Sequence, residues 1–168
     1  DPTGDKFRQH YRSDARLVAD FFSARAVRAA VGERRATIIT SFSMLYDLDR
    51  PLDFVIEVAS VLHPDGVWVF EQSYLPTMLA RNSYDTVCHE HLEYYSLQQI
   101  RWMLEHAGLE IVDVEFNDVN GGSFSVVAAH SGSAHRSVAN VAAAMAAERR
   151  LELEALQTYE AFAGRVAK

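Results

Sequence analysis

The stretch ATIITSFSMLYDLDRPLDFVIEVASVLHPDGVWVFEQSY, residues 36–74, contains two apolar β-type runs on either side of a helical segment. The first run, 36–42, is rich in β-branched residues, as is typical of a buried parallel strand. Pro51 suits the first position of a helix, and the apolar residues after it recur at helical spacing. HPDG (63–66) predicts a turn before the second strand, 67–74. This strand–helix–strand order predicts a parallel sheet.

On the amino-terminal side of this unit the pattern predicts one more strand and one more helix. Residues 15–21, ARLVADF, mix apolar and β-compatible positions and are predicted as a strand. The alanine-rich segment 23–33 is predicted as a helix that Ser23 caps and Gly32 ends.

On the carboxyl-terminal side the pattern predicts a helix, a hairpin and a final helix. SLQQIRWMLEHAG (96–108) has a serine cap, an apolar face and a terminal glycine. Two β-type runs, 109–118 and 123–130, flank an NGG turn and predict an antiparallel hairpin at the sheet edge. Residues 134–166 are rich in Ala, Glu, Leu and Arg and predict one long helix.

Together these elements predict an α/β fold with a doubly wound sheet that the hairpin closes. We expect two parts, a catalytic domain over residues 1–132 and a helical connector over residues 133–168. In such sheets ligands bind beyond the carboxyl ends of the strands. The rim is therefore predicted to contain Phe22–Ser23, Ser41–Tyr46, Glu71–Tyr74 and the 117–123 loop.

Composition limits the classes of function. The 168 residues are 49% hydrophobic, which is enough for one domain with a core. The formal net charge of −7 and the lack of a basic stripe argue against binding to a nucleic-acid backbone. A single cysteine excludes a disulfide framework, and neither a signal peptide nor an apolar run of membrane-spanning length is found. We expect a cytoplasmic protein without membrane or nucleic-acid partners.

The stretch SYDTVCHEHLEYYSL, residues 83–97, lies between a strand and a helix on the same rim and concentrates titratable groups. A metal site made by Cys88, His89 and His91 is one interpretation. However, the zincin pattern needs two histidines four apart on a helix, and no second ligand cluster at zinc spacing occurs, so we predict no metal. Proton transfer is the other interpretation, because histidine with its pKa near 6.5 is mostly neutral and can accept a proton at neutral pH.

GVWVFEQSYLPTML, DTVCHEHLEYYSL and NDVNGGSF together resemble the sugar C-methyltransferases that use S-adenosylmethionine to methylate nucleotide-linked deoxysugars in antibiotic biosynthesis. The resemblance extends from Asp1 to about Ala129 and more weakly through the last helix. It implies a Rossmann-like class I methyltransferase fold. It also implies an amino-terminal zinc-binding region and a further carboxyl-terminal domain as parts of the same chain, and none of the zinc-ligand cysteines is present here.

The resemblance implies a cofactor site along the rim. Asp1 matches the acidic residue that grips the ribose hydroxyls, Phe22 flanks the adenine, and Ser41 and Phe42 line the pocket of the methionine part. The glycine-rich turn that would precede Asp1 is absent from the sequence, and by this alignment the first, central strand is absent as well. We therefore expect either a fragment of a longer chain or a strand supplied by another segment.

The resemblance also implies a catalytic pair and a substrate wall. Carbon methylation needs a proton removed next to a ketone, and the family places its base and helper at Glu90 and His91. We predict His91 as general base and Glu90 as its partner or an alternative base, which requires a bent loop because adjacent residues of extended chain face opposite ways. The predicted substrate-binding residues are Tyr46, His89, Asn120 and Gly121. Cys88 stands where some relatives carry a tyrosine.

The predicted function is C-methylation of a nucleotide-linked 4-keto-deoxysugar by S-adenosylmethionine, through an enolate. Two alternatives remain open. An O- or N-methyltransferase would deprotonate a hydroxyl or amine instead, and a noncatalytic methyltransferase-like fragment would only contact partners.

Because the glycine-rich turn is absent, residues 1–168 alone are expected to bind S-adenosylmethionine poorly. Isothermal titration calorimetry of this chain with the cofactor measures the affinity directly. Tight binding would contradict the alignment of Asp1.

Overall fold

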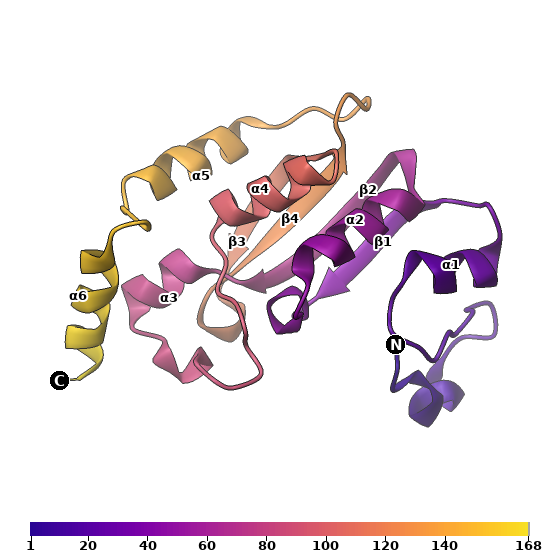
Figure 1. The fold of residues 1–168 in the computed structure, drawn as a ribbon, viewed down its shortest axis with the longest axis horizontal. Helices are drawn as coiled ribbons and strands as arrows, with labels where there is room; N and C mark the ends of the chain where they lie inside the picture. Colours follow the sequence, from indigo (N-terminus) through magenta and orange to yellow (C-terminus); the bar gives the residue numbers. More distant parts are fainter. Residues whose placement is uncertain (168) are drawn as a thin grey trace.

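The computed structural model describes residues 1–167, which form a four-stranded mixed sheet with helices packed mainly on one face (Figure 1). The elements are, in chain order, η1 (Gly4–His10), α1 (Ala24–Val31), β1 (Ala36–Phe42), η2 (Leu45–Asp47), α2 (Pro51–Val61), β2 (Leu62–Ser73), α3 (Leu75–Arg81), η3 (Tyr84–Thr86), α4 (Leu97–His106), β3 (Leu109–Asn117), η4 (Val119–Gly121), β4 (Ser123–His130), α5 (Ala139–Arg149) and α6 (Leu156–Val166). None of the helices in these residues has the length and apolarity needed to cross a membrane.

The sheet order is β1-β2-β4-β3, with β1 and β2 parallel and β4 antiparallel to both β2 and β3. The predicted strand–helix–strand unit and the edge hairpin are confirmed. The sheet is open, however, because β1 pairs only with β2 within residues 1–167. The expectation of a closed sheet is therefore wrong for the described chain.

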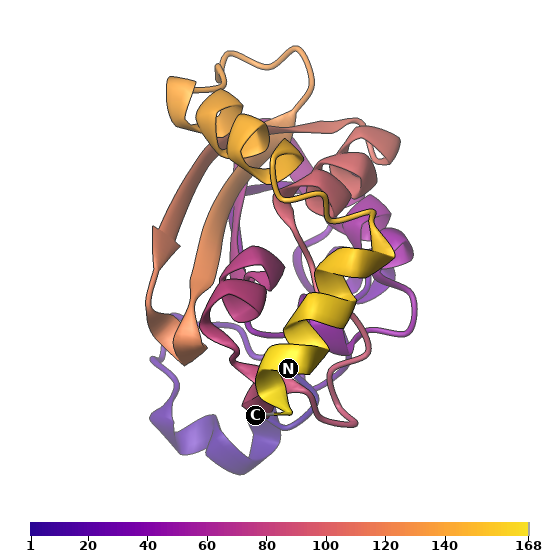
Figure 2. The ribbon, with the colours of Figure 1, turned by 90° about the vertical axis from the view of Figure 1, so that its left-hand side faces the viewer.

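The core lies between the sheet and helices α2, α4 and α5. Trp68 and Phe70 of β2 project into it and are fully buried, while Val67 and Val69 alternate to the other face and are only half-buried. Figure 2 shows the helices gathered on one side of β3 and β4. The expectation of a doubly wound sheet is thus wrong for these residues, since the second face carries no comparable helical layer.

Local signals at the helix ends are confirmed. The Ser23 hydroxyl accepts a hydrogen bond from the Ala26 N–H (3.1 Å) and begins α1, and Gly32 ends it at φ 69°. Ser96 and Gln99 form a capping box at the start of α4. Each signal works because it satisfies backbone groups that the helix itself leaves unpaired.

Three predicted elements differ from the structure. Residues 15–21 form no strand, because a strand needs a neighbour to pair with and Phe21 is instead 76% exposed. HPDG (63–66) is the first part of β2 rather than a turn. The predicted helix over 134–166 is two helices, α5 and α6, separated by a turn in which Glu152 takes φ 49°.

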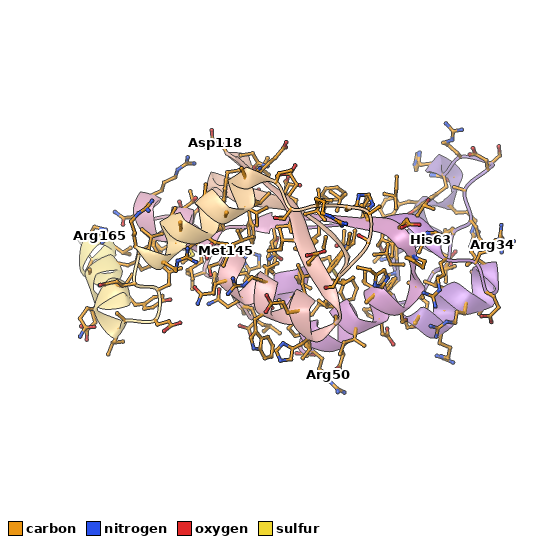
Figure 3. The ribbon with its side chains drawn as sticks, turned by 90° about the horizontal axis from the view of Figure 1, so that it is seen from above. Arg34, Arg50, His63, Asp118, Met145 and Arg165 are labelled. Atoms are coloured by element: carbon orange, nitrogen blue, oxygen red, sulfur yellow. The ribbon has the colours of Figure 1, made fainter. Side chains whose placement is uncertain are left out.

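Tertiary contacts explain the break in the last helix. Glu148, near the end of α5, is 2% exposed, and its carboxylate accepts hydrogen bonds from Tyr74 Oη (2.7 Å) and Leu97 N (2.6 Å). Arg165 of α6, labelled in Figure 3, donates to the Leu79 carbonyl (2.6 Å) at the end of α3. The two helices thus pack on different parts of the domain, and helix propensity alone does not decide their direction.

Tyr74 and Tyr95 offer a matched test of these buried contacts. Both rings are buried, yet the Tyr74 hydroxyl donates to Glu148, whereas the Tyr95 hydroxyl has no hydrogen-bond partner among the described residues. Tyr74→Phe is expected to lower the free energy of unfolding by about 1.5–3 kcal/mol because it removes a donor to a buried charge. Tyr95→Phe should be neutral or slightly stabilising. Urea unfolding of both variants measures the difference, and equal losses would contradict this account.

The same tyrosines make the free energy of unfolding depend on pH. Burial raises the pKa of both phenols, and for Tyr74 the Glu148 carboxylate raises it further. In the unfolded chain these phenols ionise near pH 10, whereas in the folded protein they stay protonated at that pH. Their contribution to the free energy of unfolding is therefore fully present below about pH 10 and is lost as the pH rises towards the pKa values of the folded state. Each Phe variant should reduce this alkaline loss in unfolding curves recorded between about pH 9 and 11.

Candidate functional site

The candidate site lies at the rim where β1, β2 and β3 end. Backbone hydrogen bonds join the segments there: Ser43 N donates to the Glu71 carbonyl (2.8 Å), Tyr74 N to that of Gly122 (3.1 Å) and Leu75 N to that of Tyr95 (2.9 Å). The rim predicted from sequence is confirmed for these strand ends. Phe22 does not end a strand, but its ring packs 5.0 Å from that of Phe54 on α2, close to the same end of the sheet.

His91 is held at this rim by two kinds of contact. Its Nδ1 lies 2.8 Å from the Thr86 carbonyl oxygen, and its ring centroid lies 4.4 Å from that of Tyr46 on η2. A carbonyl only accepts hydrogen bonds, so Nδ1 carries a proton. In the neutral imidazole Nε2 is then the unprotonated nitrogen, which is the state a general base requires.

The loop bends as the prediction of a shared Glu90–His91 site requires, since the His91 N–H donates to the Cys88 carbonyl (3.3 Å) across a turn. Glu90 nevertheless lies on the outside of that turn. Its carboxylate is 3.8 Å from His89 Nε2 and 3.9 Å from Cys88 Sγ, and the side chains of Glu90 and His89 are 72% and 90% exposed. The structure therefore joins His91 to Tyr46 more closely than to its sequence neighbour Glu90.

Two further groups of this region, Tyr94 and Asp47, were not among the predicted site residues, although the sequence favoured Tyr94 as part of the wall. Tyr94 Oη donates to the same Thr86 carbonyl (3.4 Å), and burial, reinforced by the nearby Cys88, raises the pKa of this phenol. Tyr94 is thus a neutral hydrogen-bond donor at physiological pH. Asp47 follows Tyr46 on η2, directly after the predicted rim segment Ser41–Tyr46; burial raises the pKa of its carboxyl, while His91 lowers that pKa.

The hairpin turn approaches the site through α3 and the start of the 83–95 loop. Asn120 and Gly121 take positive φ angles of 50° and 81°, and the Gly121 carbonyl accepts from Arg81 Nη1 (3.0 Å). Arg81 also pairs with Asp118 (2.7 Å), which Figure 3 labels. The predicted substrate residues of this turn therefore lie beside the segment that leads to His91.

The residues predicted to bind the cofactor either hydrogen-bond to other groups of the chain or point to different faces of the sheet. The Asp1 carboxylate accepts from the Thr3 N–H and hydroxyl (2.9 Å each), and the Ser41 hydroxyl accepts from Trp68 Nε1 (3.0 Å). Ser41 pairs with Phe70 and Phe42 with Glu71, so these two side chains project to opposite faces of the sheet. Phe42 is 58% exposed.

Within residues 1–167, no three His, Cys, Asp or Glu side chains are grouped in a way that could hold a metal ion.

A sequence model described as a methyltransferase domain matches residues 5–114. The chain belongs to the methyltransferase domain family. A second model, described as a C-methyltransferase C-terminal domain, matches residues 118–168. The family's cofactor is S-adenosylmethionine. Asp1, Phe22, Ser41 and Phe42 do not by themselves fit a closed site for it, because the oxygens of Asp1 and Ser41 are already engaged and Phe42 faces away from Ser41.

Individual relatives agree with this family. C-methyltransferase NovU of Streptomyces niveus is 39% identical to this chain over 106 residues, which cover 63% of this chain and 25% of NovU. The chain thus spans about a quarter of the length of this curated relative.

Among solved structures, the methyltransferase bound to the Haloferax volcanii Trm112 methyltransferase activator is similar, with a TM-score of 0.56, 14% identity and coverage of 79% of this chain and 68% of that chain. LepI in complex with SAM matches with a TM-score of 0.49, 10% identity and coverage of 58% and 27%. The similarity to the Haloferax protein shows a shared α/β fold.

Substitution of Gly122 tests whether the hairpin turn packs against α3. It takes φ 135°, and a Cβ there would lie 2.2 Å from Thr77 Cγ2 on α3, whereas Gly132 takes φ 82° with open space around its Cβ position. Gly122→Ala is expected to cost about 2 kcal/mol or more of unfolding free energy, from strain plus the clash. Gly132→Ala, the control, should cost about 1 kcal/mol from strain alone. Equal losses in urea unfolding would show that the turn does not pack on α3 in this way.

Proposed function

We propose that this chain carries the catalytic part of a C-methyltransferase that acts on a nucleotide-linked 4-keto-deoxysugar, with His91 as the general base. The observation that carries the proposal is the hydrogen bond between His91 Nδ1 and the Thr86 carbonyl, which leaves Nε2 as the proton acceptor. The name of NovU and the C-methyltransferase C-terminal domain matched over residues 118–168 support carbon as the methylated atom.

The chemistry begins with proton abstraction next to the ketone. The C–H bond breaks, its proton goes to His91 Nε2, and its electron pair forms an enolate whose charge rests on the former ketone oxygen. S-adenosylmethionine supplies the electrophilic methyl group for the nucleophilic carbon of that enolate. Thr86 keeps the imidazole oriented throughout, since its carbonyl accepts from Nδ1 before and after Nε2 gains the proton.

The ring of Tyr46 gives His91 a fixed position. Tyr46 is 7% exposed, and its carbonyl accepts from Leu92 N (2.9 Å) and Glu93 N (3.2 Å), the two residues after His91. The base is therefore held by ring contact on one side and by backbone bonds immediately beyond it. A preorganised base of this kind needs no rearrangement when the substrate arrives.

The test is exchange of the sugar proton with solvent. The polypeptide that the gene encodes is incubated in D₂O with a nucleotide-linked 4-keto-deoxysugar. The sugar should gain deuterium at the carbon beside the ketone, and mass spectrometry measures this gain. His91→Asn keeps a donor for Thr86 but removes Nε2, and should slow exchange and methyl transfer by about 10²- to 10⁴-fold.

His63→Asn is the matched control, because His63 lies in the first part of β2, at the end opposite the rim (Figure 3). It should leave both rates unchanged. Absence of exchange in the intact enzyme during methyl transfer would contradict the carbon-acid route and favour O- or N-methylation. Unchanged exchange in His91→Asn would remove His91 from the mechanism.

A further inference from the structure

Arg165, near the end of α6, contacts the point from which the His91 loop starts. α6 lies beside α3 (Figure 1), and the Arg165 guanidinium donates to Asn82 Oδ1 (2.8 Å) and to the Leu79 carbonyl (2.6 Å). Both acceptors belong to the end of α3. An arginine there pairs with a carbonyl that the helix leaves without a partner and interacts favourably with the helix dipole. α6 is therefore attached where the chain leaves α3 towards His91.

A neighbouring arginine at the end of α3 has different partners. Arg81 donates to the Gly121 carbonyl (3.0 Å) and pairs with Asp118 (2.7 Å), so it joins α3 to the hairpin turn. Arg165 instead joins α3 to the last helix, through the residue that begins the loop. The two arginines thus hold the end of α3 from two sides.

Hydrogen bonds continue from Asn82 to the imidazole. Asn82 ends α3 in the left-handed region, at φ 55°, and its carbonyl accepts from Tyr84 N (2.9 Å) in η3. Thr86 Oγ1 donates to the Ser83 carbonyl (2.9 Å) across the same turn. The Thr86 carbonyl accepts from His91 Nδ1 (2.8 Å). The end of α3 is therefore connected to the imidazole through η3.

Packing does not hold η3 in place. None of its three residues is buried, and Tyr84 is 58% exposed. A segment without buried side chains has little local stability of its own and takes its position from the groups at its two ends. One end of η3 meets the His91 ring, and the other begins at Asn82, which Arg165 holds. The direction of the η3 carbonyl that orients the imidazole therefore depends on the end of α3.

We propose that Arg165 is a positioning residue that acts through His91: by holding Asn82 at the end of α3, it keeps η3 in place. The Thr86 carbonyl then stays aimed at His91 Nδ1, and Nε2 remains the unprotonated nitrogen. If that carbonyl moves away, the neutral ring also populates the tautomer with its proton on Nε2, which cannot act as the base. The inference rests on the proposed role of His91. α6, which the sequence predicted as part of a connector, thus belongs to the catalytic arrangement.

The tautomer of His91 tests the inference without any activity. The polypeptide that the gene encodes is prepared with isotope-labelled histidine, and NMR observes the ring nitrogens at a pH where His91 is neutral; His91→Asn identifies their signals. The unsubstituted protein should show one tautomer, with its proton on Nδ1. Arg165→Met should bring the two nitrogen signals closer together, because both tautomers are then populated. Unchanged His91 signals in Arg165→Met would overturn the proposal.

A second variant tests the route through Asn82. Asn82→Gly removes the acceptor for Arg165 but keeps the left-handed backbone, so it should change the His91 signals in the same direction. The double variant should change them no more than Arg165→Met alone, since both substitutions remove one contact. A sum of two separate changes would overturn this route.

Arg136→Met is the matched control. The Arg136 guanidinium also donates to backbone carbonyls, those of Ser133 and His135, but it lies after β4, at the end of the sheet opposite the rim. The His91 signals should stay unchanged in this variant. A change equal to that in Arg165→Met would indicate a general effect of arginine loss and overturn the proposal.

Kinetics separate this inference from the proposed function. Arg165→Met should lower kcat by about 10-fold with KM nearly unchanged, because the base is misplaced rather than the substrate site lost. A loss in KM alone would overturn the positioning role. Full kcat in Arg165→Met beside an inactive His91→Asn would overturn this inference and leave the proposed function standing. Full activity in His91→Asn with the expected tautomer change in Arg165→Met would overturn the proposed function and leave the effect of Arg165 on the ring standing.

Discussion

The buried carboxylate of Glu148 joins three parts of the chain that are distant in sequence. It accepts from Tyr74 at the end of β2 and from Leu97 N and Gln98 N (3.0 Å) at the start of α4, and it belongs to α5. A negative charge at a helix start also interacts favourably with the helix dipole. Because α4 begins directly after the 83–95 loop, this one interaction fixes the far end of the segment that carries His91.

The middle of that segment is fixed partly by its own backbone and partly by η2. The Thr86 carbonyl, within the segment, accepts from both His91 and Tyr94, and the Tyr46 carbonyl on η2 accepts from the two residues after His91. The site is thus a loop that folds on the Thr86 carbonyl and is attached to η2 and to the start of α4, which is how a histidine outside regular secondary structure keeps one ring orientation.

The β1 edge of the sheet is exposed rather than packed. β1 is a parallel strand with an open edge within residues 1–167, and Ile38 and Phe42, which project from its uncovered face, are 66% and 58% exposed. Parallel strands are normally covered on both faces. Of the residues predicted for the cofactor, Phe42 lies on this exposed face, whereas Ser41 accepts from the buried Trp68 on the helix-covered face and Phe22 packs on Phe54 of α2.

The sequence by itself determined the strand–helix–strand unit, the hairpin, the caps at Ser23 and Ser96 and the position of the 83–97 stretch on the rim, because periodicity and capping act over a few residues. The family resemblance, including S-adenosylmethionine as cofactor, was also readable and is confirmed. The roles of individual site residues stay predictions. Only the tertiary structure decided that residues 134–166 break into two helices and that the His91 ring packs on Tyr46. Those outcomes depend on contacts between residues 40 or more positions apart, such as Glu148 with Tyr74 and the Tyr46 carbonyl with Leu92. No local pattern records such pairings.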